Sequence, residues 1–312
     1  MLRNIIIFIT TIFTLTSSTA FSFTPRSVVY GKDDRKEITN VTKPLILKQA
    51  NSIGLMVRNS KLRRLDSRST RFQSISLGQS LNLCPNSLYY NQPSLGVCSG
   101  FLISPDTLVT AGHCVTSNFE CRGYSWVFNF TDAVKTNISN QDVYKCKKIV
   151  TTKTEDTNSN KLDYAVIKLD RAVKGATPLV FRQKGKIRTG EKVYIIGHPD
   201  GLPMKYSSNA KVKPFFKFSF TFDENFGLNI HEHRRYRKDI FLANIDSFSG
   251  NSGSPVFNES TGIVEGILIE GEDDYEFDRN HGCMRVNVLK NNSFDLIEVV
   301  QRITKIPKIF LK

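Results

Sequence analysis

The sequence predicts an all-β protein, either a barrel or a sandwich. From Val28 onward, short apolar runs with alternating polar residues recur along the chain, and Gly, Pro, Asn and Asp separate them. These runs cover residues 99–104, 107–111, 126–130, 165–169, 192–197, 254–257 and 263–269. Segments with helical periodicity are nearly absent. About 285 residues follow the leader described next, which is enough for one large all-β domain or two small ones that share an interface.

Residues 1–22 have the composition of a secretory signal peptide. Arg3 supplies a basic start, residues 5–15 form an apolar run, and a mostly small-residue region follows, where a peptidase could cut after Ala20 or Ser22. The alternative is a membrane anchor, but the apolar run is shorter than the roughly 20 residues that span a bilayer. We therefore expect a secreted or periplasmic protein without a stable membrane span, in which residues 23–27 form a short prosegment.

Six cysteines fit such a compartment, because an even count in an exported chain permits three disulfides. They stand at positions 84, 98, 114, 121, 146 and 283. Zinc sites usually contain close pairs such as C-x-x-C, and the one close pair of Cys with His, His113 and Cys114, is too adjacent for an ordinary zinc site. The sequence therefore predicts structural disulfides, no metal and no cofactor.

The net charge is +14, and Lys and Arg are densest from Arg58 to Arg71. Such a run could bind nucleic acid or an acidic surface. The alternative is a solvated, flexible loop, and we favour it because no aromatic residues alternate with the charges to stack bases. We expect no specific nucleic-acid partner, although a basic exported protein can adhere to anionic envelopes or polymers.

Two later segments have distinct patterns. Residues 216–222 alternate Phe with polar residues, which indicates an amphipathic strand or an insertion that frames a substrate cleft. His231 and His233 follow, but no third ligand accompanies them, so we expect solvated loop histidines. Residues 293–304 predict a C-terminal α-helix. Ser293 can cap it, and its apolar face would contain Leu296, Ile297, Val300 and Ile303.

Residues 98–114 contain the first candidate catalytic residue. Two apolar strands flank a Pro-Asp turn and end at His113, in an Ala-Gly-His-Cys corner. Cys98 and Cys114 lie at either end of this hairpin, so antiparallel pairing would bring them close enough to form a disulfide. A histidine held in a glycine corner at the end of a strand is well placed to act as a base.

The second and third candidates are Asp163 and Ser252. Asp163 begins an apolar strand, where its carboxylate can accept a histidine N–H and fix the ring tautomer. Asp170 at the other end of that strand is the rival, but it faces a turn that contains Arg171. Ser252 lies in a turn rich in Gly, Ser and Pro, which can present a hydroxyl beside backbone N–H groups. The order His, Asp, Ser excludes the α/β-hydrolase order.

These segments resemble the three catalytic motifs of chymotrypsin-like (trypsin-like) serine peptidases: Thr-Ala-Gly-His-Cys at 110–114, Asp-Tyr-Ala-Val-Ile at 163–167 and Gly-Asn-Ser-Gly-Ser-Pro at 250–255. The last form, together with residues 28–35, is similar to the bacterial V8-like (glutamyl endopeptidase) branch. The resemblance implies two six-stranded antiparallel β-barrels with the site between them. The first barrel would cover about 28–175 and the second about 176–290 of a peptidase domain that extends over 28–312.

The resemblance also implies the chemistry. Ser252 would attack a peptide carbonyl, His113 would remove its proton, and the backbone N–H groups of Gly250 and Ser252 would hold the oxyanion. We expect a monomeric endopeptidase that acts on proteins or peptides. The alternatives are a V8-like peptidase with glutamyl or broad specificity and a catalytically inactive homologue that acts as a basic binding protein.

Substrate preference follows from positions near Ser252. By resemblance to trypsin, Asp246 would form the floor of the primary specificity pocket and select Lys or Arg, with Glu270 and Gly271 on the pocket wall. The V8-like branch has a histidine in the strand after the nucleophile. Leu268 stands there, so glutamate specificity is not favoured.

Activation and the remaining disulfides stay open. In trypsin-like enzymes a new amino terminus pairs with an aspartate directly before the nucleophile, but that residue is Asn251 here. Processing near Arg26 could still expose Val28. Cys121 and Cys146 flank one strand-rich segment and could pair, which would leave Cys84 with Cys283, but three pairings of these four cysteines are open. We expect His198, which follows a strand, to be structural.

Overall fold

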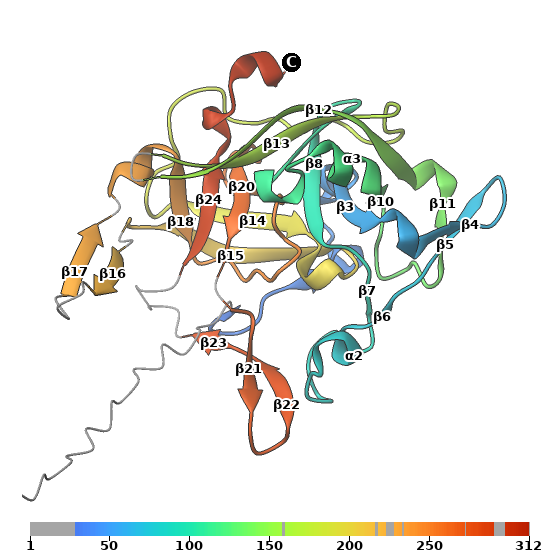
Figure 1. Ribbon diagram of the computed structural model, residues 1–312, viewed down its shortest axis with the longest axis horizontal. Coiled ribbons are helices and arrows are strands. Elements are labelled where there is room, and N and C mark those ends of the chain that lie inside the picture. The colour runs from blue at the N-terminus through green and yellow to red at the C-terminus, as the bar shows by residue number, and fades with distance from the viewer. Residues whose placement is uncertain are drawn as a thin grey trace, which may run out of the picture.

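Two closed β-barrels form the body of the protein in a computed structural model (Figure 1). The structure describes residues 29–157, 160–215, 218–222, 228–232, 234–271, 273–289 and 297–311. The predicted signal peptide, prosegment and Val28 lie outside these residues, as do residues 216–217, Ser293, Leu296 and His233. None of the helices found in the described ranges is long and apolar enough to cross a membrane.

The first barrel consists of six antiparallel strands, each paired with the next around a closed ring. In ring order they are β10 (Tyr124–Phe128), β12 (Val143–Asp156), β13 (Lys161–Leu169), β9 (Thr107–Thr110), β8 (Cys98–Ser104) and β3 (Ile53–Arg58). Large side chains fill it, including Phe101, Trp126 and Phe128, each at most 1% exposed. Closure leaves the barrel without an unpaired edge.

The second barrel also has six strands in a closed ring, and the pairing of the first with the last strand in the order given next closes it. In ring order they are β14 (Lys192–Gly197), β19 (Pro255–Asn258), β20 (Val264–Glu270), β24 (Glu298–Arg302), β18 (Ile240–Ala243) and β15 (Lys205–Lys213). The short strand β2 (Lys36–Glu37) adds to β15. The prediction of two six-stranded antiparallel barrels is confirmed.

Short elements surround the barrels. The strands are β1 (Val29–Tyr30), β4 (Leu62–Arg64), β5 (Ser69–Phe72), β6 (Ile75–Ser76), β7 (Pro93–Ser94), β11 (Asn137–Ser139), β16 (Phe218–Phe222), β17 (Leu228–Glu232), β21 (Tyr275–Asp278), β22 (Cys283–Val286) and β23 (Val288–Leu289). The α-helices are α1 (Pro44–Ala50), α2 (Leu77–Leu81) and α3 (Asn118–Gly123). The 3₁₀ turns are η1 (Ile38–Asn40), η2 (Asn59–Lys61), η3 (Gly112–Cys114), η4 (Asn140–Asp142), η5 (Pro199–Gly201), η6 (Arg234–Lys238), η7 (Ile303–Lys305) and η8 (Lys308–Phe310).

The predicted C-terminal helix is not present in the described part of 293–304. Residues 298–302 form β24, which lies between β18 and β20 and completes the second barrel, and a 3₁₀ turn follows at residues 303–305. The second barrel therefore extends past its predicted end near residue 290. In β24, the four residues from Glu298 to Gln301 are all buried, so other parts of the protein cover both faces of this strand. The predicted amphipathic helix would have buried only one apolar face.

The basic run from Arg58 to Arg71 is also more ordered than predicted. Instead of a flexible loop, β4 and β5 form a hairpin, and β11 adds a third strand to it.

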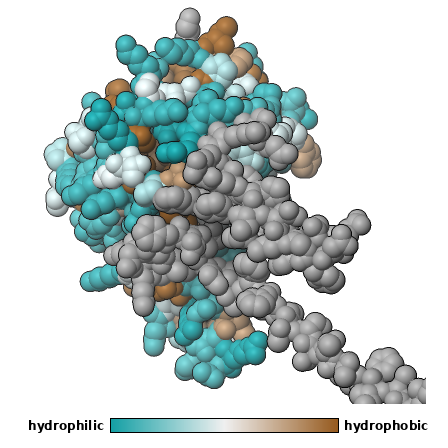
Figure 2. All heavy atoms as spheres, turned by 90° about the vertical axis from the view of Figure 1, so that its left-hand side faces the viewer, coloured by the Kyte–Doolittle hydropathy of each residue, from teal (hydrophilic) through white to brown (hydrophobic). Residues whose placement is uncertain are grey.

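The described residues on the face in Figure 2 are mostly hydrophilic, with apolar side chains in small groups.

Three disulfides are present: Cys98–Cys114, Cys121–Cys146 and Cys84–Cys283. The first closes the β8–β9 hairpin onto η3, as its spacing predicts. The second connects α3 to β12, and the third ties the segment after α2 to β22. The pairing left open by the sequence is thereby settled in favour of the local Cys121–Cys146 bridge.

Candidate active site

His113 and Asp163 form a close pair at the edge of the first barrel. His113 lies in η3, directly after β9, and Asp163 lies in the neighbouring strand β13. The ring Nδ1 of His113 is 2.7 Å from Oδ2 of Asp163, and the backbone N–H of His113 donates to Oδ1 at 2.9 Å. Two contacts to one carboxylate fix both the backbone and the ring of the histidine.

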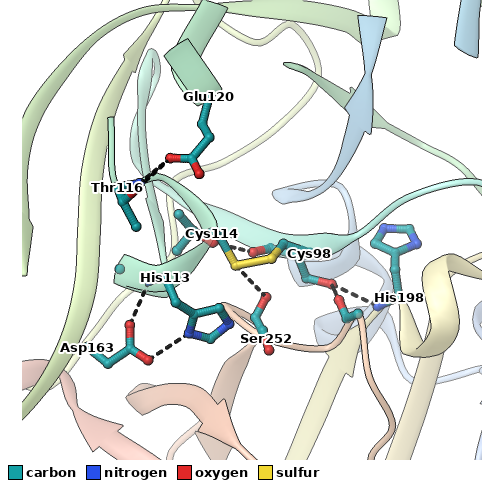
Figure 3. The surroundings of a disulfide bond; sticks show 12 residues. Cys98, His113, Cys114, Thr116, Glu120, Asp163, His198 and Ser252 are labelled. Atoms are coloured by element: carbon teal, nitrogen blue, oxygen red, sulfur yellow. Dashed lines mark hydrogen bonds and ion pairs between the residues drawn. A yellow bond between two sulfur atoms is a disulfide. The ribbon is translucent and has the colours of Figure 1, made fainter. Parts of the chain in front are cut away.

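Gly112 makes this approach feasible. A Cβ atom at this position would clash with the backbone carbonyl of Lys153 and crowd the carboxylate of Asp163. The Cys98–Cys114 disulfide holds the other side of the turn (Figure 3). The glycine corner thus brings His113 against β13, as its sequence context suggested.

Ser252 reaches the same place from the second barrel. Its backbone carbonyl accepts a hydrogen bond from the N–H of Ser99 at 2.8 Å, and the Ser99 hydroxyl donates to the carbonyl of Gly250 at 2.9 Å. Strand β8 of the first barrel therefore holds the serine turn directly. Figure 3 shows the ring of His113 lying between Asp163 and Ser252. The structure brings these three predicted residues together.

The turn around Ser252 leaves backbone donors uncommitted. Gly250 and Gly253 have φ angles of +85° and +89°, which favour glycine. The N–H of Gly253 donates to the carbonyl of Leu268 at 2.8 Å. In contrast, the N–H groups of Gly250 and Ser252 donate to no acceptor among the residues that the structure describes. Within the described residues, the turn therefore keeps two backbone donors available to a further acceptor, one on Ser252 itself and one two residues before it.

A cavity of about 400 Å³ opens beside Ser252. One wall comes from residues 247–249 and the other from residues 268–271, while Asp273, Asp274 and Glu298 add carboxyl groups. The predicted residues Glu270 and Gly271 both line it. A Cβ atom on Gly271 would clash with the Glu298 carboxylate, so the absence of a side chain at Gly271 leaves space for this carboxylate.

The carboxyl groups of the cavity differ in charge. Burial, together with the neighbouring Asp200, raises the pKa of Asp274 to about 8, so this group keeps a proton near neutral pH. Glu270 forms an ion pair with Lys161, with 2.7 Å between Oε2 and Nζ. Glu298 is only 1% exposed and belongs to β24. The cavity is therefore lined by carboxyl groups, of which Asp274 is protonated near neutral pH and Glu270 is paired with Lys161. The helix expected over residues 293–304 gave no reason to place Glu298 in a cavity.

Asp246 lies outside this cavity, unlike the expectation from resemblance. Its Oδ1 accepts the backbone N–H of Tyr30 at 2.8 Å, and its Oδ2 accepts the N–H of Asp34 at 2.9 Å. It is 4% exposed, and burial, with a smaller contribution from the charge of Asp34, raises its pKa to about 7. The side chain therefore turns toward the N-terminal segment and away from the place where a substrate side chain would enter.

Two other groups near the site are structural. The ring of His198 is fully buried, with Nδ1 2.9 Å from the carbonyl of Leu202, and burial lowers its pKa to about 3. The ligand atoms of Cys98, His113 and Cys114 lie within 4.8 Å of one another. Both sulfurs are in a disulfide and so are not thiolates, which leaves His113 without the partners that a metal needs.

Known proteins share this sequence pattern and architecture. A family model described as the trypsin-like peptidase domain matches residues 98–267. No protein of curated function matches the sequence. A solved structure of a Glu endopeptidase in complex with MPD has a TM-score of 0.51 at 19% identity, and the match covers 91% of this chain and 97% of that chain. The active form of the Rv3671c protease from M. tuberculosis has a TM-score of 0.44 at 17% identity, covering 92% of this chain and 89% of that chain.

Proposed function

The chain belongs to the trypsin-like peptidase family, and from this premise we propose that it is an exported serine endopeptidase that uses Ser252, His113 and Asp163. The observation that supports the proposal most directly is the 2.7 Å contact between Asp163 and Nδ1 of His113, with the ring beside Ser252. A carboxylate at Nδ1 holds the imidazole in the tautomer whose Nε2 can accept a proton from a serine.

The first half of the reaction forms an acyl-enzyme. Ser252 Oγ attacks the peptide carbonyl while Nε2 of His113 takes the hydroxyl proton, and Asp163 stabilises the resulting imidazolium. Negative charge develops on the carbonyl oxygen, where the free N–H groups of Gly250 and Ser252 would stabilise it. The tetrahedral intermediate then collapses, the C–N bond breaks, and His113 returns the proton to the leaving amine.

The second half releases the acid. Water replaces the amine, and His113 takes one of its protons as the oxygen attacks the ester carbon. A second tetrahedral oxyanion forms against the same two N–H groups and collapses, and Ser252 leaves with the proton that His113 carries. Every proton moves between Ser252, His113, water and substrate, so no cofactor is required.

For specificity, we propose cleavage after Lys or Arg. The cavity beside Ser252 is lined by several carboxyl groups, of which Glu298 is the most buried. These carboxyl groups would attract a cationic side chain and repel a glutamate side chain. Glu298, in place of Asp246, is therefore the residue that we assign to recognition of the basic group. The solved relative is named a Glu endopeptidase, but this cavity argues against the same preference here.

Export is part of the proposal. Three disulfides within the described ranges are typical of proteins that fold in an oxidising compartment, and residues 1–22 have the pattern of a signal peptide. Processing before Val28 would then produce the mature chain.

The proposal is tested by digestion of a denatured protein mixture, with the new termini identified by mass spectrometry. The expected result is cleavage after Lys and Arg, which disappears in Ser252→Ala. Cleavage after Glu or after mixed residues would contradict the proposed Lys/Arg specificity of the cavity, but it would still support the proposal that the protein is a peptidase. If a correctly disulfide-bonded protein gives no cleavage and no labelling by a serine-directed fluorophosphonate, the enzyme assignment fails and a binding function replaces it.

A further inference from the structure

A second cavity, of about 760 Å³, lies on the first barrel and shares no lining residue with the cavity at Ser252. It opens between the β4–β5 hairpin, η4 and the start of β12. We propose that this cavity, the basic groove, binds an anionic polysaccharide that carries sulfate or carboxylate groups. The groove is lined by four cationic side chains: Arg64, Lys145, Arg171 and Lys174.

Arg171 forms the fixed part of the groove. Its Nη2 donates to three backbone carbonyls in residues 140–143, at 2.8 to 3.3 Å, and its guanidinium lies 3.9 Å from the ring centre of Tyr144. Its Nη1 pairs with Asp170 at 3.1 Å. Asp170 is the one carboxylate in the lining, so Arg171 already balances the acidic charge of the groove.

Of the other three cations, Arg64 donates from Nε to the backbone carbonyl of Asp66 at 3.0 Å. Arg64, Lys145 and Lys174 are exposed, and none of them forms an ion pair with a carboxylate in the described part of the chain. Like charges around one concave surface reinforce the local positive potential, which attracts an anionic ligand. The groove therefore has unbalanced positive charge on its rim and a neutral, internally bonded floor.

The hairpin holds part of this charge in place. Arg64 belongs to β4, which pairs with β5 through three residues, and β5 pairs with β11 in the same way. Thr70 of β5 donates to the Asn140 side chain at 2.6 Å, which ties the hairpin to η4. Cations held by paired strands lose less conformational freedom on binding than cations on a flexible loop.

The lining favours a polysaccharide over the other polyanions. The aromatic ring in the lining, that of Tyr144, is 1% exposed and lies against Arg171, so bases would find no surface on which to stack. Leu62 and Val143 are the aliphatic residues of the lining, which is little for the apolar centre of a protein interface. Amide side chains such as Gln141 can bond sugar hydroxyls between the charged groups.

The experiment measures binding of the full chain to dextran sulfate at several salt concentrations, with neutral dextran as the uncharged probe. The test variant is Lys145→Glu with Lys174→Glu. The matched control is Lys43→Glu with Lys48→Glu, which makes the same change in net charge at exposed lysines around α1. Lys145→Ala with Lys174→Ala repeats the test without charge reversal, and thermal unfolding checks that each variant folds.

We expect the groove variant to bind dextran sulfate at least about tenfold more weakly, with the slope of log K against log salt smaller by about two, because each lysine contact to a polyanion contributes about one unit. The control should retain wild-type affinity. Equal losses of affinity in both variants would show that dextran sulfate responds to the overall charge of the protein and not to the groove, and this would overturn the proposal. Tighter binding of a single-stranded DNA of equal charge would overturn the choice of polysaccharide.

Discussion

At the scale of single residues, the candidate site depends on the two oxygens of Asp163. One oxygen accepts the backbone N–H of His113 and the other contacts its ring. An amide in place of the carboxylate would present an N–H₂ group to one of these contacts. The histidine would then be held in the wrong tautomer, with a proton already on the nitrogen that faces Ser252.

We therefore expect Asp163→Asn to lower kcat by about 10⁴, with a much smaller change in KM. The measurement is steady-state cleavage of a peptide that the wild-type protein cuts. Asp170→Asn is the control, because Asp170 lies at the far end of the same strand and pairs with Arg171. Equal losses in the two variants would mean that the strand, and not the pairing with His113, is what the mutation disturbs.

Glu298 gives a second prediction at this scale. Glu298→Gln keeps the shape of the side chain and removes its charge, so kcat/KM for substrates with Lys or Arg before the cleaved bond should fall by about 10- to 100-fold. Cleavage after uncharged residues should be nearly unchanged. The comparison is Asp246→Asn, which should leave the ratio of the two substrate classes as it is. If only Asp246→Asn changed the ratio of kcat/KM between basic and uncharged substrates, Asp246 and not Glu298 would be the residue that recognises the basic group.

The sequence could identify some of these residues and not others, for a physical reason. His113, Asp163 and Ser252 stand in short motifs whose local geometry follows from neighbouring glycines and strand ends. The direction of Asp246 and the place of Glu298 depend on how distant strands pair. Glu298 enters the cavity because β24 lies between β18 and β20, which no local pattern specifies.

At the scale of elements, the clearest difference between prediction and structure is the C-terminal segment. Ile297, Val300 and Ile303 have helical spacing, but the segment is equally apolar at Val299, and all of these residues are buried. Such a run cannot be distinguished from a buried strand by periodicity alone. The strand forms because β18 and β20 offer it backbone partners on both sides, which outweighs its local helical preference.

The N-terminal segment is the second element with a testable role. Asp246 binds the backbone N–H groups of Tyr30 and Asp34, and the guanidinium of Arg35 lies 3.6 Å from the ring centre of Phe248, which lines the cavity at Ser252. The segment thus holds the loop that leads to Gly250.

Asp246→Ala should therefore destabilise the fold and weaken catalysis together. Two backbone donors would lose their acceptor in a buried place, which costs about 1–3 kcal/mol for each unsatisfied group. We expect the free energy of unfolding in urea to fall by about 2–4 kcal/mol. Glu155→Ala, which breaks the exposed ion pair with Lys153, is the control and should change stability by less than about 1 kcal/mol. A loss no larger than in the control would show that the segment is not held through Asp246.

At the scale of the whole molecule, the candidate site exists only where the two barrels meet. His113 and Asp163 come from the first barrel and Ser252 from the second, and the Ser99 contacts to Gly250 and Ser252 join them. The Cys84–Cys283 disulfide adds a covalent link between segments separated by 199 residues. Alternating apolar runs suffice to predict strands, but the alignment of the barrels depends on these long-range contacts.

The same junction contains one buried carboxyl group, Asp246, and one half-buried carboxyl group, Asp274, and they predict how stability depends on pH. The pKa of Asp246 is raised to about 7 and that of Asp274 to about 8, from 3.8, in both cases mainly by burial. In the unfolded chain these groups lose their protons near pH 4. Between pH 6.5 and 7.5 the folded protein therefore binds more protons at these two groups than the unfolded chain does, and this lowers its stability as the pH rises.

Two groups oppose this trend at the ends of the range. The pKa of His198 is lowered by burial to about 3 from 6.5, so the unfolded chain still binds part of this proton at pH 6.5, and the pKa of Lys205 is lowered by burial to about 8 from 10.5, so the folded protein begins to lose that proton toward pH 8. Near pH 7 the two carboxyl groups outweigh both. Urea unfolding of the Ser252→Ala protein at pH 6.5, 7 and 7.5 should show the decline, up to about 1.4 kcal/mol per pH unit for each proton released. Asp274→Asn cannot release this proton, so its decline should be smaller, most visibly above pH 7. Stability that rises over this range, or an unchanged slope in Asp274→Asn, would mean that Asp274 is already ionised in the folded protein and contributes its full charge to the cavity beside Ser252.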